Sequence, residues 1–166
     1  QQHIIAAPVE RIGRELVVYL RQTGLDPNDG PDPVHVAEGY RERAETLVQM
    51  ADSARYCYED FDEIESAAAR KHLRPVILEP LKAVRENLSN LPVWDKEAIA
   101  AAVEGTAESC GIKMGKLGQP VRVAVTGGAV SPPIDVTIYL VGRERTLNRL
   151  DHAVKIIESR KGSGQP

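Results

Sequence analysis

The stretch KMGKLGQPVRVAVTGGAVSPPID, residues 113–135, decides the fold of this chain. It sets one short apolar run between glycines and a Ser-Pro-Pro corner at residues 131–133, and the run carries a single charge, Arg122. Pro120 at a first helical position and Gly127 just past the end fit a short helix. The valines of the run also alternate as they would in a strand. In either form, rigid bends on both sides fix the direction of Arg122, which favours recognition over bulk packing.

The composition indicates a globular chain of one domain or two small ones. Of the 166 residues, 42% are apolar but only 4% are aromatic. The core must therefore consist of Leu, Ile, Val and Ala, which favours helices. No apolar run approaches the roughly 20 residues of a membrane span, and the amino terminus has no signal-peptide pattern. We expect a cytoplasmic protein that does not bind a membrane.

The charges are distributed unevenly along the chain. The formal net charge of −3 argues against a nucleic-acid partner. Residues 113–161, however, hold nine Lys or Arg and four Asp or Glu, a net charge of +5. Residues 1–112 hold twelve basic and twenty acidic side chains, a net charge of −8. The basic end can orient a phosphate backbone, or it can be an ordinary solvated helix face.

No cluster of side chains forms a recognisable metal site. Cys57 and Cys110 lack the Cys or His neighbours of a zinc site, so we predict two buried or half-buried thiols. The four histidines are scattered. The acidic run at residues 59–65 could supply carboxylates to magnesium or calcium, but it lacks the alternation and the glycine of a calcium loop. We interpret it as a solvated connector and predict no metal in this chain.

Periodicity and capping residues predict mostly helices. Asp32 and Asp95 are N-cap residues, and Gly24 and Gly111 follow helix ends. The segment 133–140 stays open, because its residues favour a strand while Ser131 before Pro132 is typical of a helix cap. The predicted helices cover residues 8–22, 33–50, 65–73, 76–91, 96–110 and 143–160, with a kinked helical stretch at 52–59.

Catalytic motifs are absent from the sequence. There is no phosphate-binding P-loop, no Gly-x-Ser-x-Gly elbow and no His-Glu-x-x-His pair. Thr126-Gly127-Gly128 resembles part of a dinucleotide loop, but a third glycine is missing. This interpretation, a small dehydrogenase-like enzyme, predicts a parallel sheet.

Several short stretches, in this order, resemble bacterial glutamyl-tRNA synthetase, a class I enzyme, in its carboxy-terminal part. The resemblance covers essentially the whole chain, and the ordered combination is specific although no single piece is. Residues 2–5 resemble the point at which the catalytic half of that family ends. The stretches are RERAETL at 41–47, ARY at 54–56, HLRP at 72–75, the central 113–135, GRER at 142–145 and NRL at 148–150.

This resemblance implies an all-α protein, the helical cage that grips the transfer RNA anticodon. It implies two stacked helical subdomains, 1–66 and 67–166, with helices at the open segments. The chain would be a monomeric fragment of glutamate–tRNA ligase, without a catalytic site, whose partner is the anticodon loop of tRNA(Glu). ATP and magnesium would bind in the missing catalytic half, and no cofactor in this chain. The alternative is a stand-alone helical domain that binds RNA or protein without ligase chemistry.

The resemblance also implies particular contacts. Arg43 falls where a helix arginine contacts the first anticodon base and distinguishes glutamate from glutamine transfer RNAs. The remaining anticodon contacts fall on Arg122, Ser131, Pro132 and Ile134. An arginine fork can read a base edge or stack on it, and Ile134 can be an apolar platform. Candidate phosphate contacts are Lys113, Lys116, Arg143, Arg145 and Arg149.

Two observations weigh against these assignments. Taken alone, Arg43 could simply pair with Glu38 or Glu42, which would contribute only a few tenths of a kcal/mol. The arginines after Gly142 could equally form a solvated face. The chain also departs from the family at Glu104, where some members have an arginine that contacts the anticodon.

Overall fold

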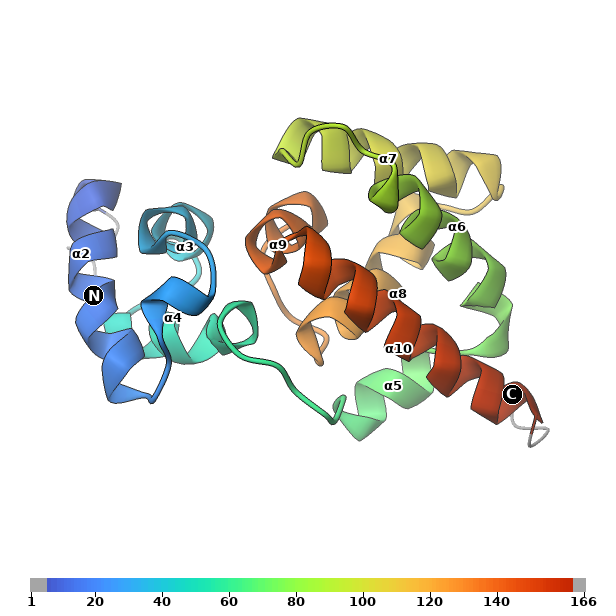
Figure 1. Cartoon of the computed structure of the whole chain (residues 1–166), viewed down its shortest axis with the longest axis horizontal. Coiled ribbons are helices and arrows are strands. Elements are labelled where there is room, and N and C mark those ends of the chain that lie inside the picture. The colour runs from blue at the N-terminus through green and yellow to red at the C-terminus, as the bar shows by residue number, and fades with distance from the viewer. Residues whose placement is uncertain (1–5, 163–166) are drawn as a thin grey trace. The chain divides into compact units, whose positions relative to one another are not determined.

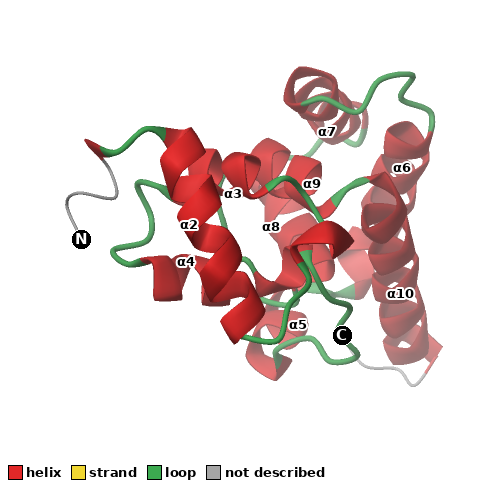
Figure 2. Ribbon diagram, turned by 60° about the vertical axis from the view of Figure 1, so that its left-hand side comes forward, coloured by secondary structure: helices red, strands yellow, loops and turns green. Residues whose placement is uncertain are grey.

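The computed structural model describes residues 6–162, and these residues form helices and connecting loops without a strand (Figures 1 and 2). The predicted all-α class is therefore confirmed, and the parallel sheet of the dehydrogenase interpretation does not occur in this part of the chain. His3 and the stretch 2–5 lie outside the described residues. Between residues 6 and 162, no helix has both the length and the apolar character that a membrane span requires.

The chain divides into two compact units, Gln1–Asp60 and Phe61–Pro166. The division falls inside the acidic run at residues 59–65. Phe61, which the predicted boundary at 66/67 assigns to the first subdomain, packs within the second unit: its ring lies 4.5 Å from the Arg149 guanidinium.

The first unit is built around α2 (Val9–Gln22), whose buried face is Ile12, Leu16 and Leu20, as predicted. This helix packs on α3 closely at Gly13. A Cβ added there would lie 2.8–2.9 Å from atoms of Val34, a separation that real side chains do not tolerate. The other elements of this unit are η1 (Pro27–Asp29), α3 (Pro33–Tyr40), α4 (Leu47–Ser53) and η2 (Arg55–Cys57).

The predicted helix over residues 33–50 is wrong, because the structure breaks it into α3 and α4. Asp32 caps α3 as expected, but the helix ends at Tyr40. Thr46 then caps α4: its hydroxyl accepts a hydrogen bond from the Gln49 backbone N–H at 3.1 Å. The Gln49 side chain accepts one from the Glu45 N–H at 2.9 Å. These two side-chain bonds form a variant of the capping box, which starts a new helix.

In the second unit, α10 (Arg143–Gly162) packs along α6 and α8. Its buried face is rotated from the predicted stripe. Leu150 and Ile157 are buried as expected, whereas Leu147 and Val154 are only half-buried at its edge. The other elements are α5 (Ser66–His72), η3 (Pro75–Ile77), α6 (Leu78–Ser89), α7 (Lys96–Ser109), α8 (Met114–Thr126) and α9 (Ile134–Val141).

The central stretch is the helix α8, which starts at Met114 and not at Pro120. Pro120 lies inside the helix, and Gly115 and Gly118 do not break it. The helix contacts α5, α6, α7, α9 and α10. Because neighbours cover it on several sides, Val121, Val123 and Val125 are all fully buried. A helix surrounded in this way needs apolar residues all round, which explains the strand-like alternation.

The open segment 133–140 is also a helix, α9, despite its strand-forming residues. Thr137, Ile138 and Leu140 are buried, so packing outweighs local propensity. Ser131 does not cap this helix, whose first residues have no side-chain cap. The predicted state of the cysteines is confirmed, since Cys57 is buried and Cys110 is half-buried.

Candidate nucleic-acid interface

Arg122 organises the corner between α8 and α9. Its Nε donates to the Ser131 hydroxyl at 2.7 Å and its Nη1 to the Gln119 side-chain oxygen at 2.5 Å. Its Nη2 donates to the Pro132 carbonyl at 3.2 Å. The guanidinium therefore joins the middle of α8 to the chain entering α9. Its three nitrogens bind three groups in fixed directions, which a lysine could not do.

Ser131 lies at the centre of this corner and is 6% exposed. Besides Arg122, its hydroxyl pairs with the Thr137 hydroxyl at 2.8 Å. The Thr137 hydroxyl donates to the Pro132 carbonyl at 2.8 Å. Buried polar groups are costly unless they are paired. Here they pair with each other, so Ser131 and Pro132 are held inside the corner.

The loop before the corner is fixed along its backbone as well. The Gly127 carbonyl accepts from the Glu65 N–H at 2.8 Å, and the Ala129 carbonyl accepts from the Gln119 amide at 2.9 Å. Gly127 has a φ of 82°, a left-handed conformation that favours glycine. A Cβ there would also lie 3.2 Å from the Phe61 ring. The loop 127–133 therefore has little freedom to move.

This fixed loop exposes apolar side chains. Val130 is 80% exposed, Pro133 is exposed and Ile134 is half-buried. A single exposed apolar side chain is ordinary, whereas apolar side chains that follow closely on one rigid loop can form a contiguous binding surface. Ile134 was predicted from the resemblance as an anticodon contact, whereas Val130 was not among the predicted contacts. The available signal was an apolar residue directly before the Ser-Pro-Pro corner.

Two of the residues predicted as phosphate contacts, Arg149 and Arg143, also make contacts inside the second unit. Arg149 is 8% exposed, with its guanidinium 4.5 Å from the Phe61 ring, and it donates to the Val125 carbonyl at 2.7 Å. Arg143 donates to the Leu91 carbonyl at 2.8 Å and lies 5.0 Å from the Trp94 ring. Both arginines hold elements of the second unit together. Because these internal contacts engage both guanidinium groups, we do not carry the two arginines forward as phosphate contacts.

The other predicted phosphate contacts are not gathered at the corner. Lys113 and Lys116 are exposed at the start of α8. The corner follows the other end of this helix, about 20 Å away at 1.5 Å per residue. Arg145 is half-buried on α10, and Glu104 is exposed on α7.

Arg43 lies in the turn between α3 and α4, not on a helix as predicted. Its side chain is exposed, while the turn is fixed around it. The Arg43 and Ala44 N–H groups both donate to the Tyr40 carbonyl, at 2.9 and 3.0 Å. Arg41 binds the Ala7 carbonyl at 2.7 Å. A cation on a fixed turn can be presented to a partner without first being ordered.

A buried pair of tyrosines, Tyr40 and Tyr56, lies next to this turn. The hydroxyls of Tyr40 and Tyr56 lie 2.9 Å apart, and Tyr40 also donates to the Ser53 carbonyl at 3.3 Å. Burial raises the pKa of both hydroxyls far above the usual value of 10. Both tyrosines therefore stay protonated and neutral at physiological pH.

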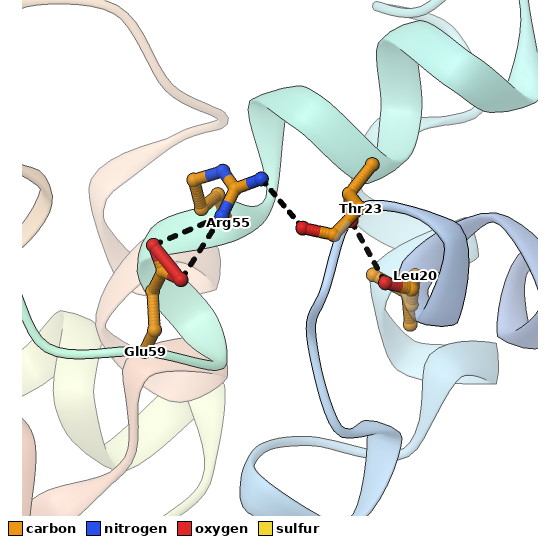
Figure 3. Close-up of polar contacts among 4 residues, drawn as sticks. All are labelled: Leu20, Thr23, Arg55 and Glu59. Atoms are coloured by element: carbon orange, nitrogen blue, oxygen red, sulfur yellow. Dashed lines mark hydrogen bonds and ion pairs between the residues drawn. The ribbon is translucent and has the colours of Figure 1, made fainter.

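Arg55, within the ARY stretch, fixes the end of α2 (Figure 3). Its guanidinium donates to the Thr23 carbonyl at 2.9 Å, and also to both Glu59 carboxylate oxygens at 2.9 and 3.0 Å. Thr23 in turn donates to the Leu20 carbonyl at 2.8 Å. This arginine therefore contributes to the fold of the first unit.

The acidic run does not form a metal site. Among residues 6–162, no group of three or more His, Cys, Asp or Glu side chains converges as a metal-binding set would. Glu59 pairs with Arg55, and the Glu65 backbone binds Gly127.

Comparison with known proteins agrees with this architecture. A family model described as an anticodon binding domain matches residues 12–154. A glutamate tRNA ligase from Elizabethkingia meningosepticum, in complex with its amino acid, is similar with a TM-score of 0.84 and 20% identity over 95% of this chain. A glutamate-tRNA synthetase from Elizabethkingia anophelis is similar with a TM-score of 0.78 and 20% identity over 93%. At this identity the likeness shows the fold. The chain spans 31% and 30% of the lengths of these two proteins.

Proposed function

The chain belongs to the anticodon-binding domain family, and we propose that it binds the anticodon loop of a glutamate transfer RNA. The observation that carries this proposal is the loop 127–133, which is hydrogen-bonded along its length and yet exposes Val130 at 80%. Anticodon bases are unpaired and can be splayed out onto such a surface.

At the corner, we assign the apolar side chains to stacking. Val130 and Ile134 are the platform on which a base or ribose packs, since both are at least partly exposed. Arg122, Ser131 and Pro132 give this platform its shape through their mutual hydrogen bonds. A fixed platform lowers the entropy that binding would otherwise cost.

Arg43 is assigned to the first anticodon base. It is exposed on a turn whose backbone is already ordered. Its planar fork can donate two hydrogen bonds to one base, and a wrong base leaves those donors unpaired. This is the contact through which we propose that glutamate and glutamine transfer RNAs are distinguished.

The chain is, in this proposal, the anticodon-binding part of a monomeric cytoplasmic glutamate–tRNA ligase. The chain matches a segment that makes up about 30% of the length of each of two such ligases, which supports this assignment. ATP, magnesium and glutamate would bind in the catalytic part, which these 166 residues do not include. The two units would then serve as the two anticodon-binding subdomains.

Binding of hairpin RNA tests the proposal. The 166-residue chain is titrated with a hairpin that carries the anticodon CUC and with hairpins in which each anticodon base is either changed or removed to leave an abasic nucleotide. Loss of one stacked base weakens binding by about 1–3 kcal/mol, roughly 5-fold to 150-fold in Kd. A Kd that does not depend on the anticodon would overturn the proposed function.

Val130→Ser tests the platform directly, and Val76→Ser is the matched control. Both valines are 80% exposed, and Val76 lies in η3, outside the corner. We expect Val130→Ser to weaken hairpin binding severalfold and Val76→Ser to leave it unchanged. Equal affinities for the two variants would remove Val130 from the interface.

A further inference from the structure

A second surface of the second unit collects positive charge away from the corner. Arg70, Lys71 and Arg74 are exposed at and just after the end of α5. Arg160 and Lys161 lie at the end of α10. We call these five residues the basic surface.

Hydrogen bonds bring the two parts of the basic surface together. Arg160 donates through Nη1 to the Ala69 carbonyl at 2.8 Å and to the Leu73 carbonyl at 2.6 Å. These carbonyls flank Arg70 and Lys71 in the chain and directly precede Arg74. These two bonds therefore hold the end of α10 beside the end of α5; both helices are labelled in Figure 1.

Among residues 6–162, Arg70, Lys71 and Arg74 of the basic surface are not paired with acidic side chains. Residues 66–77 contain three basic and no acidic side chains, and residues 159–166 contain two basic and none acidic. Glu158 is the adjacent carboxylate on α10, and it lies 3.6 Å from Lys82.

The local fold does not account for these charges. Cations in the last turn of a helix usually stabilise its unsatisfied carbonyls. In α5, Arg160 already binds two of those carbonyls. Further cations at the same place repel one another. Burial, followed by the charge of Lys71, lowers the pKa of His72 below its usual 6.5. Such a concentration of charge, in a chain of net charge −3, fits a polyanionic partner.

We infer that the basic surface binds phosphate groups of the RNA stem whose loop is held at the corner. This inference rests on the proposed function. The helix α10 links the two places: Arg149 binds the end of α8 beside the corner, and Arg160 lies eleven residues further along. That separation is about 17 Å at 1.5 Å per residue, which lies within the length of a short RNA stem. One stem-loop can therefore reach both surfaces.

The salt dependence of binding tests the inference. Each phosphate contact contributes about 0.7–0.9 to the slope of log Kd against log salt concentration. The triple variant Arg70→Gln/Lys71→Gln/Arg74→Gln should lower this slope by about 2 and weaken binding at low salt. All three side chains are exposed, so circular dichroism and thermal unfolding of the variant should match the wild type.

The control is Arg11→Gln/Arg14→Gln/Arg21→Gln, three exposed arginines on α2. This control lowers the net charge by the same three units as the basic-surface variant. Its effect on the slope therefore measures only the long-range attraction between the protein and the RNA. The slope should fall by about 2 for the basic-surface variant and much less for the control. Equal slopes for these two variants, or a slope unchanged from the wild type, would overturn the inference.

A second experiment uses a hairpin with a shortened stem. If the basic surface contacts the stem, removing its distal base pairs should lower the wild-type slope and abolish the difference between wild type and triple variant. A difference that persists would place the phosphates elsewhere and refute the assignment to the stem. Failure of the proposed function is recognised separately, since it would show as a wild-type Kd that is independent of the anticodon.

Discussion

Replacement of Arg122 by lysine keeps the positive charge but removes the planar guanidinium group, so it separates the effects of these two properties. The arginine binds Ser131, Gln119 and Pro132 through three different nitrogens. A lysine ammonium at the same place keeps the charge but cannot reach three partners that lie in different directions. It satisfies one of them, so about two hydrogen bonds are lost.

The loss in the free energy of unfolding depends on which hydrogen-bond partners Ser131, Gln119 and Pro132 keep after the replacement. Hydrogen bonds to charged donors contribute about 1.5–3 kcal/mol each. Ser131 and Pro132 keep Thr137 as a second partner, which places the loss at the lower end of that range. We expect Arg122→Lys to destabilise the second unit by about 3 kcal/mol. At about 4 °C per kcal/mol for a unit of this size, its Tm falls by about 12 °C.

Calorimetry and hydrogen exchange measure this effect. The transition of the second unit should shift down, and the amides of residues 127–133 should lose protection first. Hairpin affinity should fall only as far as the corner opens locally, because the apparent Kd rises as the inverse of the binding-competent fraction. The slope of log Kd against log salt should not change, since the charge remains. Arg74→Lys, at an exposed position outside the corner, is the control and should leave stability unchanged.

Two results would refute this reasoning. An unchanged Tm together with unchanged protection of residues 127–133 would show that Arg122 does not hold the corner. A large loss of hairpin affinity at full stability would instead make Arg122 a direct base contact.

Two further predictions concern the first unit. In the full-length enzyme, Arg43→Gln should reduce the preference for glutamate over glutamine transfer RNA, measured as the ratio of charging efficiencies; an unchanged ratio would contradict the role of Arg43. The second is alkaline unfolding. Burial raises the pKa of Tyr40, Tyr56 and Tyr58 above their unfolded value of 10, so the stability that they contribute is complete below pH 10 and is lost as the pH rises further. For three tyrosines the loss is about 4 kcal/mol per pH unit. Tyrosinate absorbance should therefore rise cooperatively with loss of helix, and independent titration near pH 10 without unfolding would contradict it.

Much of the fold follows from local sequence signals. Asp95 caps α7 as predicted, with the Ala98 N–H bound at 2.8 Å. Ile12, Leu16 and Leu20 form the buried stripe of α2. These signals act within a few residues, through capping atoms and helical spacing, so they can be recognised without knowledge of the neighbours.

Other signals were misleading because distant contacts decide them. Pro120 suggested a helix start, yet α8 begins at Met114 because packing on several sides stabilises the longer helix. The break between α3 and α4 is a different case, because the local capping pair Thr46 and Gln49 marks it and the prediction of one helix over residues 33–50 overlooked that pair. Neither case could be settled from propensity alone.

The residue types of the candidate interface were determined by the sequence itself: an arginine, a Ser-Pro-Pro corner and glycine bends between residues 113 and 135. Which side chains face outward was decided only by tertiary structure. Arg149 is polar but buried by partners far along the chain, and Ser131 is polar but buried between α8 and α9, whereas Val130 is apolar but exposed at 80%. The physical reason is that exposure depends on the packing of helices that are remote in sequence, while capping and turn chemistry depend on neighbours along the chain.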